Sequence, residues 1–283
     1  MSQKVPVLVD AAYLHDHPEA RIVDVRFGNK SSSGRQKYLS GHLPGAVYAE
    51  LESELSHTRR DRGRHPWPET ATFARLLSRL GIGPETHVVA VDDGQLGYAG
   101  RLWFMLRAFG HEKVSLLDGG LKAWCDAGGP LETGEPAVAP APLRELKLDA
   151  SRIAERPEIE AIAEGRSRAL LLDARAPERY RGEVEPLDRV PGHIPGAVNA
   201  PYAANLRADG RFKAPAELRA LYEKLGVSTA TEVIASCGSG VTACHDLVAL
   251  ELAGFPPARL YVGSYSEWAS DPARPVATGD RIR

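Results

Sequence analysis

The sequence predicts an α/β protein of two tandem domains, each a mostly parallel β-sheet flanked by helices. Two observations support this class. A pattern of short motifs in the N-terminal half returns in the C-terminal half, and short apolar segments alternate with segments of helical periodicity in both halves. Such alternation is typical of a parallel sheet covered by helices on both faces. The length of 283 residues also suits two average domains better than one.

The internal repeat consists of four pairs of similar segments. These are residues 22–26 and 171–175, 41–47 and 192–198, 87–91 and 232–236, and 121–124 and 265–268. A spacing of roughly 145 to 150 residues indicates a duplicated domain and not a short-period solenoid. Residues 135–142 are rich in proline and alanine, a composition that stays extended. We therefore expect a first domain over 1–134, a linker over 135–146 and a second domain over 147–283.

The secondary structure follows from runs and periods of apolar residues. In the first copy we expect strands near 21–25 and 87–91 and helices near 70–80 and 98–109. In the second copy we expect strands near 169–172 and 232–236, and helices near 151–163, 215–225 and 241–253. In sheets of this class ligands bind at the carboxyl ends of the strands. The loop after residue 236 is therefore the first place to look for a site.

That loop contains a cysteine. Cys237 follows the apolar strand, Gly238, Ser239 and Gly240 come next, and a helical pattern then begins. Glycines allow backbone N–H groups to converge on the centre of such a loop, and the helix dipole adds positive charge there. Both features favour a thiolate, which is the nucleophilic form of cysteine. A buried core cysteine is the alternative, because free cysteine is among the most buried residue types. The flanking glycines, for which a core strand has no use, favour a reactive Cys237.

Two motifs that occur in both copies are expected to be structural. The Asp-x-Arg motif at the end of a buried strand predicts an ion pair that fixes a loop, and Gly-His-x-Pro-Gly predicts a rigid turn. The cysteine itself is not repeated. Aligning Gly110 with Gly254 puts Asp93 opposite Cys237. A carboxylate is no sulfur nucleophile and would occupy the anion position itself, so we expect the first copy to be inactive and to contribute at most a wall to a cleft between the domains.

Composition excludes several classes of function. A net charge of −2 gives no indication of nucleic acid or an acidic membrane as a partner, and no apolar run has the length of a signal peptide core or a membrane span. Three cysteines do not make a disulfide framework, so we expect a cytoplasmic protein. The nine histidines lack metal-ligand spacing, so no metal is expected. Cys244 is expected to be a buried small side chain.

These motifs together resemble the rhodanese family of sulfurtransferases in its tandem-domain form, over nearly the whole chain. The loop Cys237-Gly238-Ser239-Gly240-Val241-Thr242 is similar to that of 3-mercaptopyruvate sulfurtransferases. Thiosulfate-specific members usually carry a basic side chain in this loop, and here there is none. The resemblance implies two rhodanese-like domains, transfer of a sulfane sulfur from 3-mercaptopyruvate through a cysteine persulfide, and no cofactor. It also implies a thiol acceptor, such as a small thiol or a thioredoxin-like protein, or cyanide.

The resemblance also assigns roles to individual residues. Cys237 matches the persulfide-carrying cysteine, and Arg179 matches the arginine that binds the anionic group of the substrate. Ser239 matches a serine that acts with a histidine and an acidic residue, at the positions of His65 and Glu52. The loop residues assigned to substrate binding are Gly238, Gly240, Val241 and Thr242.

The sequence departs from the family pattern at two positions. The family's acidic residue is usually Asp, and this chain has Glu52. The family commonly has a second arginine for the substrate carboxylate where this chain has Leu187. Arg189, two residues further on, is the expected substitute. If it does not substitute, selectivity for mercaptopyruvate over thiosulfate is in doubt.

Three alternatives to a mercaptopyruvate enzyme stay open. A thiosulfate sulfurtransferase would use the same cysteine. A cysteine phosphatase or arsenate reductase would need an arginine closing the loop, where this chain has Ala243. A binding module or sulfur carrier would keep the scaffold without turnover.

Overall fold

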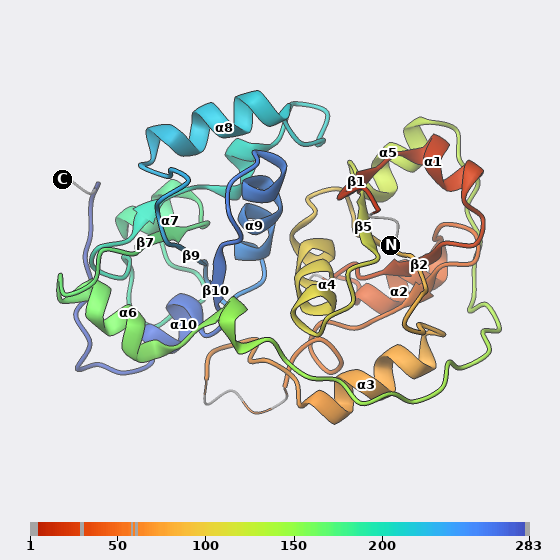
Figure 1. Ribbon diagram of the computed structural model, residues 1–283, viewed down its shortest axis with the longest axis horizontal. Helices are drawn as coiled ribbons and strands as arrows, with labels where there is room; N and C mark the ends of the chain where they lie inside the picture. The colour runs from red at the N-terminus through yellow and green to blue at the C-terminus, as the bar shows by residue number, and fades with distance from the viewer. Residues whose placement is uncertain (1–4, 29–30, 58, 60–61, 281–283) are drawn as a thin grey trace. The chain divides into compact units, whose positions relative to one another are not determined.

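The computed structural model describes residues 5–28, 31–57, 59 and 62–280 (Figure 1). The chain forms two compact units with one sheet each. The first unit comprises Met1–Thr58, Trp67–Asp149 and Ala208–Arg211, and the second comprises Arg59–Pro66, Ala150–Arg207 and Phe212–Arg283. Residues 59–66 therefore belong to the second unit, although they lie within the first copy of the sequence repeat.

The first unit contains a five-stranded sheet in the order β1-β5-β4-β2-β3, with every pairing parallel. Its strands are β1 (Leu8–Val9), β2 (Arg21–Asp24), β3 (Val47–Tyr48), β4 (Val88–Val91) and β5 (Val114–Leu117). Its helices are α1 (Ala11–Asp16), α2 (Gly34–Ser40), α3 (Thr70–Arg79), α4 (Gly97–Ala108) and α5 (Gly120–Asp126).

The second unit repeats this topology in the order β6-β10-β9-β7-β8, again with parallel pairings. Its strands are β6 (Ile153–Ala154), β7 (Leu170–Asp173), β8 (Val198–Asn199), β9 (Val233–Ser236) and β10 (Arg259–Tyr261). Its α-helices are α6 (Arg156–Ala163), α7 (Pro177–Arg181), α8 (Pro215–Lys224), α9 (Ala243–Leu252) and α10 (Ser264–Trp268). Two 3₁₀-helices, η1 (Ala150–Arg152) and η2 (Tyr202–Asn205), complete the described elements.

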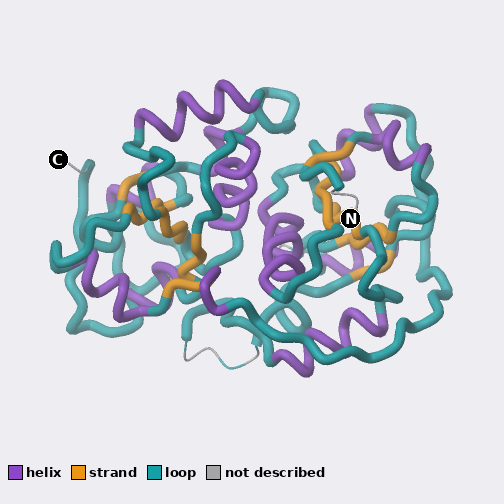
Figure 2. The backbone as a smooth tube through the Cα atoms, viewed as in Figure 1, coloured by secondary structure: helices purple, strands orange, loops and turns teal. Residues whose placement is uncertain are grey.

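In each unit the strands lie at the centre, with helices and loops around them (Figure 2). All residues of β4, β5, β7 and β9 are buried. Continuous burial explains why these strands are mostly apolar and do not alternate, since a parallel sheet is covered on both faces. Helices α4 and α9 are buried around most of their circumference as well. The predicted fold class is confirmed.

The two repeated motifs have the structural roles predicted for them. In the second unit Arg175 pairs with Asp173 at 2.6 Å and donates to the carbonyl of Gly192 at 2.8 Å. His193 stacks on Tyr180 with ring centroids 3.7 Å apart. The first unit repeats both arrangements, with Arg26 on Asp24 and Gly41, and His42 on Tyr38.

The central elements lie where the sequence predicted them, within about three residues, except at one helix. The helix expected near 151–163 begins at Arg156, because residues 150–152 form a 3₁₀ turn and 153–154 pair with β10 as an edge strand. Residues 135–146, the predicted linker, contain no helix or strand. Ala141 within them forms two hydrogen bonds with Ser78 of α3, of 2.9 and 2.6 Å. None of the described helices is long and apolar enough to span a bilayer.

Candidate active site

The cysteine loop joins β9 to α9 at the carboxyl edge of the second sheet. The Sγ atom of Cys237 accepts the backbone N–H groups of Ser239 at 3.4 Å and Gly240 at 3.1 Å. Gly240 has φ of +74°, a conformation that turns its N–H inward and that suits glycine. Cys237 is 1 % exposed. The sulfur thus lies in a cradle of backbone donors, which stabilises negative charge on it.

A second segment, at the start of α10, holds the backbone of the cysteine loop through hydrogen bonds. The N–H of Cys237 donates to Ser264 Oγ at 3.0 Å, and its carbonyl accepts the N–H of Tyr265 at 2.9 Å. The carbonyl of Gly238 accepts the N–H of Ser266 at 2.9 Å. Because the backbone groups of the loop have partners on another element, its shape does not depend on a bound ligand.

Ser239 and His65 are in direct contact. His65 Nδ1 lies 2.8 Å from Ser239 Oγ. The segment that carries His65 packs against the start of α10, where the N–H of Arg64 donates to Ser266 Oγ at 3.0 Å. A Cβ at Gly63 would lie 2.7 Å from the carbonyl of Gly263, so this close approach requires a glycine. The hydroxyl of this pair belongs to the second residue after Cys237, close enough to the sulfur to move a proton there.

Glu52 lies in the first unit, in the turns after β3. Its role as the acidic partner of His65 stays a prediction.

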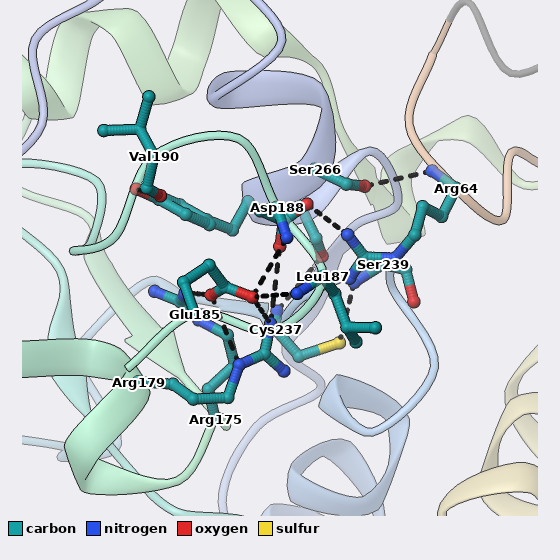
Figure 3. Close-up of polar contacts among 12 residues, drawn as sticks. Arg64, Arg175, Arg179, Glu185, Leu187, Asp188, Val190, Cys237, Ser239 and Ser266 are labelled. Carbon is teal, nitrogen blue, oxygen red and sulfur yellow. Dashed lines mark hydrogen bonds and ion pairs between the residues drawn. The ribbon is translucent and has the colours of Figure 1, made fainter. Parts of the chain in front are cut away.

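Three arginines and two acidic residues form an ion-pair network near the cysteine loop (Figure 3). Arg179 pairs with Glu185 at 2.6 Å and with Asp188 at 3.4 Å. Arg175 also reaches Glu185, at 3.3 Å, and Arg64 pairs with Asp188. The side chain of Arg175 is 1 % exposed, against 18 % for Arg179 and 28 % for Arg64. Arg175 therefore has a structural role, whereas Arg179 and Arg64 are accessible to an incoming anion.

The two acidic residues differ in how firmly they hold their charge. Burial raises the pKa of Glu185, but hydrogen bonds from Arg179 and from the N–H groups of Asp188 and Leu187 outweigh it, so the net direction is down. Burial also raises the pKa of Asp188, and here the pairing with Arg64 does not compensate, so the net direction is up. Asp188 is thus the more easily protonated of the two.

The remaining loop residues shape the site through their backbone. Val241 is buried, and its carbonyl accepts the N–H of Cys244 at 3.0 Å. Thr242 is the N-cap residue of α9 and makes no side-chain cap hydrogen bond. Cys244 is fully buried, as predicted, with Sγ 3.5 Å from the carbonyl of Gly240.

Leu187 is exposed, as is Arg189. Within the described part of the chain the guanidinium of Arg189 has no hydrogen bond or ion pair, so nothing fixes it toward the sulfur. The guanidinium nearest to Gly238 is that of Arg64, which the sequence analysis did not single out. A Cβ built on Gly238 would lie 2.7 Å from Arg64 Nη2 and 3.6 Å from Arg179 Nη1. The signal available in the sequence was only that Arg64 precedes His65.

The equivalent loop of the first unit corrects one sequence alignment. In the sheet registers Val91 pairs with Asp24 as Ser236 pairs with Asp173, so the residue opposite Cys237 is Asp92 and not Asp93. The Asp92 carboxylate accepts four N–H groups of its own loop, from Gly94, Leu96, Tyr98 and Ala99, at 2.9 to 3.2 Å. It fills the cradle that the sequence analysis assigned to Asp93. Counting back from Gly110 misplaced the alignment by one residue.

Asp93 corresponds to Gly238 and has a different partner. Its carboxylate pairs with Lys37 at 2.8 Å and lies 4.0 Å from Arg26. Lys37 precedes Tyr38 as Arg179 precedes Tyr180, and both tyrosines donate to an alanine carbonyl and stack on a histidine. Lys37 is therefore the counterpart of Arg179 in the first copy.

Comparison with known proteins identifies the family. The model of the rhodanese-like domain matches residues 10–127 and 157–271. A Pseudomonas aeruginosa protein named "Probable 3-mercaptopyruvate sulfurtransferase" is 46% identical over 93% of this chain and 94% of its own. "Putative thiosulfate sulfurtransferase SseB" of Mycobacterium tuberculosis is 43% identical over 99% of both chains. The crystal structure of SseA, a 3-mercaptopyruvate sulfurtransferase of Escherichia coli, has a TM-score of 0.82 at 36% identity, covering 93% of this chain and all of that one. The chain belongs to the rhodanese family and carries two rhodanese-like domains.

Proposed function

We propose that the protein is a 3-mercaptopyruvate sulfurtransferase that carries the sulfur as a persulfide on Cys237. The observation that carries this assignment is the placement of the Ser239–His65 pair beside a sulfur held by two backbone N–H groups. The similarity to proteins named for this activity supports it.

In the first half-reaction the Cys237 thiolate attacks the thiol sulfur of the donor. An S–S bond forms, the C–S bond of the donor breaks, and its electron pair remains on carbon as pyruvate enolate. The enolate takes a proton, which Ser239 supplies with His65 as its partner. Pyruvate and the cysteine persulfide are the products. Arg179 binds the carboxylate of the donor through charge-assisted hydrogen bonds.

In the second half-reaction a thiolate or cyanide attacks the outer sulfur of the persulfide and releases the Cys237 thiolate. A small thiol or a thioredoxin-like protein is the proposed acceptor. The two covalent half-reactions imply ping-pong kinetics. All three cysteines are free thiols in the structure, in keeping with the reducing cytoplasm as the proposed location.

Thiosulfate is the second candidate donor. It is favoured by Leu187, which removes an expected carboxylate partner, and by the name of the M. tuberculosis relative. Thiosulfate gives sulfite as the leaving group, and sulfite needs no proton. The Ser239–His65 pair would then have no task in the first half-reaction, so its geometry favours mercaptopyruvate.

The test compares both donors in wild type, Cys237→Ser and Ser239→Ala. We expect kcat/KM to be higher for mercaptopyruvate, Cys237→Ser to be inactive, and mass spectrometry of donor-treated wild type to find one added sulfur on Cys237. Ser239→Ala should lower the mercaptopyruvate reaction about 100-fold and the thiosulfate reaction much less, since only the former loses a proton donor. A wild type that prefers thiosulfate, with Ser239→Ala affecting both donors alike, would make the protein a thiosulfate sulfurtransferase. Turnover of p-nitrophenyl phosphate would indicate a phosphatase, and no turnover of any of the three would indicate a binding module.

A further inference from the structure

The geometry points to Ser264 as a positioning residue for the sulfur of Cys237. The hydroxyl of Ser264 fixes the N–H of Cys237, and thereby the direction in which Cys237 carries its side chain. The inference rests on the proposed function in one respect, that Cys237 is the nucleophile, and it holds for either sulfur donor. It adds to the site a residue that the sequence analysis did not single out.

The first observation is the backbone conformation of Ser264. Its φ is +51°, and in the described part of the chain Leu96 is the only other non-glycine residue with a positive φ. Residues other than glycine rarely take this conformation, because their Cβ crowds the following carbonyl. Ser264 is also fully buried. A glycine would take the same φ without strain, so what the serine adds is its hydroxyl.

The second observation is what this hydroxyl contacts. It accepts the N–H of Cys237 at 3.0 Å and donates to the carbonyl of Tyr261 at 2.9 Å. The carbonyl of Cys237 accepts the N–H of Tyr265 at 2.9 Å. One segment therefore holds the peptide groups on both sides of the Cys237 Cα atom. Together they fix the Cα–Cβ bond, and with it the place of Sγ at 3.1 and 3.4 Å from two N–H donors.

The third observation is the equivalent position in the first unit, which has no thiol in its loop. The repeat of residues 121–124 and 265–268 places Gly120 opposite Ser264. The two residues have nearly the same φ, +58° and +51°. In both units the next N–H along the chain donates to a carbonyl of the loop, at 2.8 and 2.9 Å. The two positions are therefore equivalent in conformation and in contacts.

The two positions differ in the space around them. A Cβ on Gly120 would lie 2.5 Å from the carbonyl of Asp92 and 2.6 Å from the nitrogen of Gly94, so the first unit admits only glycine. The second unit accommodates the Cβ and the hydroxyl of Ser264. The strained serine is thus in the copy with the cysteine, and an unstrained glycine is in the copy with the aspartate. This contrast links the hydroxyl to the thiol and not to the fold that both copies share.

The consequence concerns the attack on the sulfur donor. Without the hydroxyl the buried N–H of Cys237 loses its acceptor, and the peptide before Cys237 loses its restraint. The sulfur is then held less firmly against the N–H groups of Ser239 and Gly240, which stabilise its negative charge. Because the same sulfur attacks either donor, the loss affects mercaptopyruvate and thiosulfate alike. Ser264 is fully buried and does not bind the donor, so KM should change little.

The experiment replaces Ser264 by glycine and by alanine. Ser264→Gly removes the hydroxyl and the strain, whereas Ser264→Ala removes only the hydroxyl. Both should lower kcat about 10-fold for whichever donor the wild type uses, and change KM less than about threefold, as expected for a lost hydrogen bond that binds no donor. In urea unfolding the midpoint of Ser264→Gly should be no lower than that of Ser264→Ala, because glycine takes a positive φ without strain. Activity should therefore follow the hydroxyl and not the stability.

Ser236→Ala is the matched control. Ser236 is a buried serine directly before Cys237, and its hydroxyl donates to the carbonyl of Leu172 at 3.0 Å and not to the cysteine loop. This variant should lower the urea midpoint but keep kcat within about twofold of wild type. The inference is overturned if Ser264→Gly keeps the kcat of wild type. It is also overturned if Ser236→Ala loses as much activity as the Ser264 variants, which would mean that any lost hydrogen bond in this region slows the reaction.

Alkylation of Cys237 by iodoacetamide reports on the sulfur itself, without a donor. Mass spectrometry follows it separately from alkylation of Cys125, an exposed cysteine that serves as the internal standard. At neutral pH Ser264→Gly should slow the alkylation of Cys237 about 3- to 10-fold and leave that of Cys125 unchanged. An unchanged or faster rate at Cys237 would refute the role of Ser264. If wild type turns over neither donor, the proposed function fails, and this measurement still decides whether Ser264 positions the sulfur.

Discussion

Substitution by alanine should have different effects at two glycines of the cysteine loop, a loss of stability at Gly240 and a loss of activity at Gly238. Gly240 has φ of +74°, and a Cβ on it would lie 2.4 Å from the backbone carbonyl of Val262. Gly238 has no positive φ. The atom nearest to its Cβ position is the end of the flexible Arg64 side chain, at 2.7 Å. Gly240→Ala therefore strains the backbone, whereas Gly238→Ala displaces a side chain.

The magnitudes follow from these contacts. A non-glycine residue in the left-handed region costs about 1–2 kcal/mol, and forcing atoms into a packed site costs a further ~1–3 kcal/mol. The lower entropy of the unfolded alanine chain returns ~0.4–1 kcal/mol. Gly240→Ala should thus lower the free energy of unfolding by roughly 2–4 kcal/mol. Gly238→Ala should change it by less than about 1 kcal/mol, but should lower kcat/KM for mercaptopyruvate at least ~10-fold, because the guanidinium of Arg64 is displaced.

The assay is urea unfolding of both variants together with steady-state kinetics. The reasoning is refuted if Gly240→Ala is as stable as wild type, or if Gly238→Ala is destabilised to the same extent as Gly240→Ala. A Gly238→Ala enzyme of unchanged kcat/KM would show that the space above this residue is not used by the donor.

Two further predictions concern the Asp92 loop of the first unit and His245, the buried histidine of α9. Asp92→Cys, made in the Cys237→Ser background, should show neither turnover nor added sulfur on the introduced thiol, because Asp93 already pairs with the Lys37 cation. Mass spectrometry after donor treatment tests this. Stoichiometric persulfide on the introduced thiol would contradict it. Burial lowers the pKa of His245 to about 3, well below its value of about 6.5 in an unfolded chain. As pH falls below 6.5 the unfolded state takes up a proton that the folded state does not, so stability is lost, by about 2 kcal/mol between pH 7 and pH 5. His245→Gln should remove this part of the pH dependence in urea unfolding, and an unchanged difference between the two pH values would contradict the assignment.

The sequence predicted those parts of the fold that have a local signal. The buried strand β4 is a continuous apolar run, β9 is apolar up to Ser236 at its end, and the repeat indicated that the two are equivalent. The two-residue edge strands, such as β3 and β8, have no such signal, because they exist only through pairing with a neighbour that is distant in sequence.

The loop glycines next to Cys237 were enough to predict a reactive cysteine. The resemblance to the family was needed to predict that Ser239 and His65 act together. Two features could not be read in this way. The strand repeat 87–91 and 232–236 places Asp92 opposite Cys237, whereas the glycines at the helix ends place Asp93 there, and the sheet registers decide for Asp92. Arg64 is one of many arginines in the sequence, and its importance comes from the fold that brings residues 59–66 into the second unit.

The four N–H groups that converge on Asp92 restrict which side chains can occupy this position. These donors require an acceptor, because the carboxylate that they contact is fully buried. An apolar replacement would have left each of them unpaired, at a cost of ~1–3 kcal/mol per group. A short carboxylate, with two oxygens and several lone pairs, satisfies all four at once. The shape of this loop therefore depends on an acidic side chain at position 92, and the carboxylate that takes the place of the cysteine is as much a part of the framework as the strand before it.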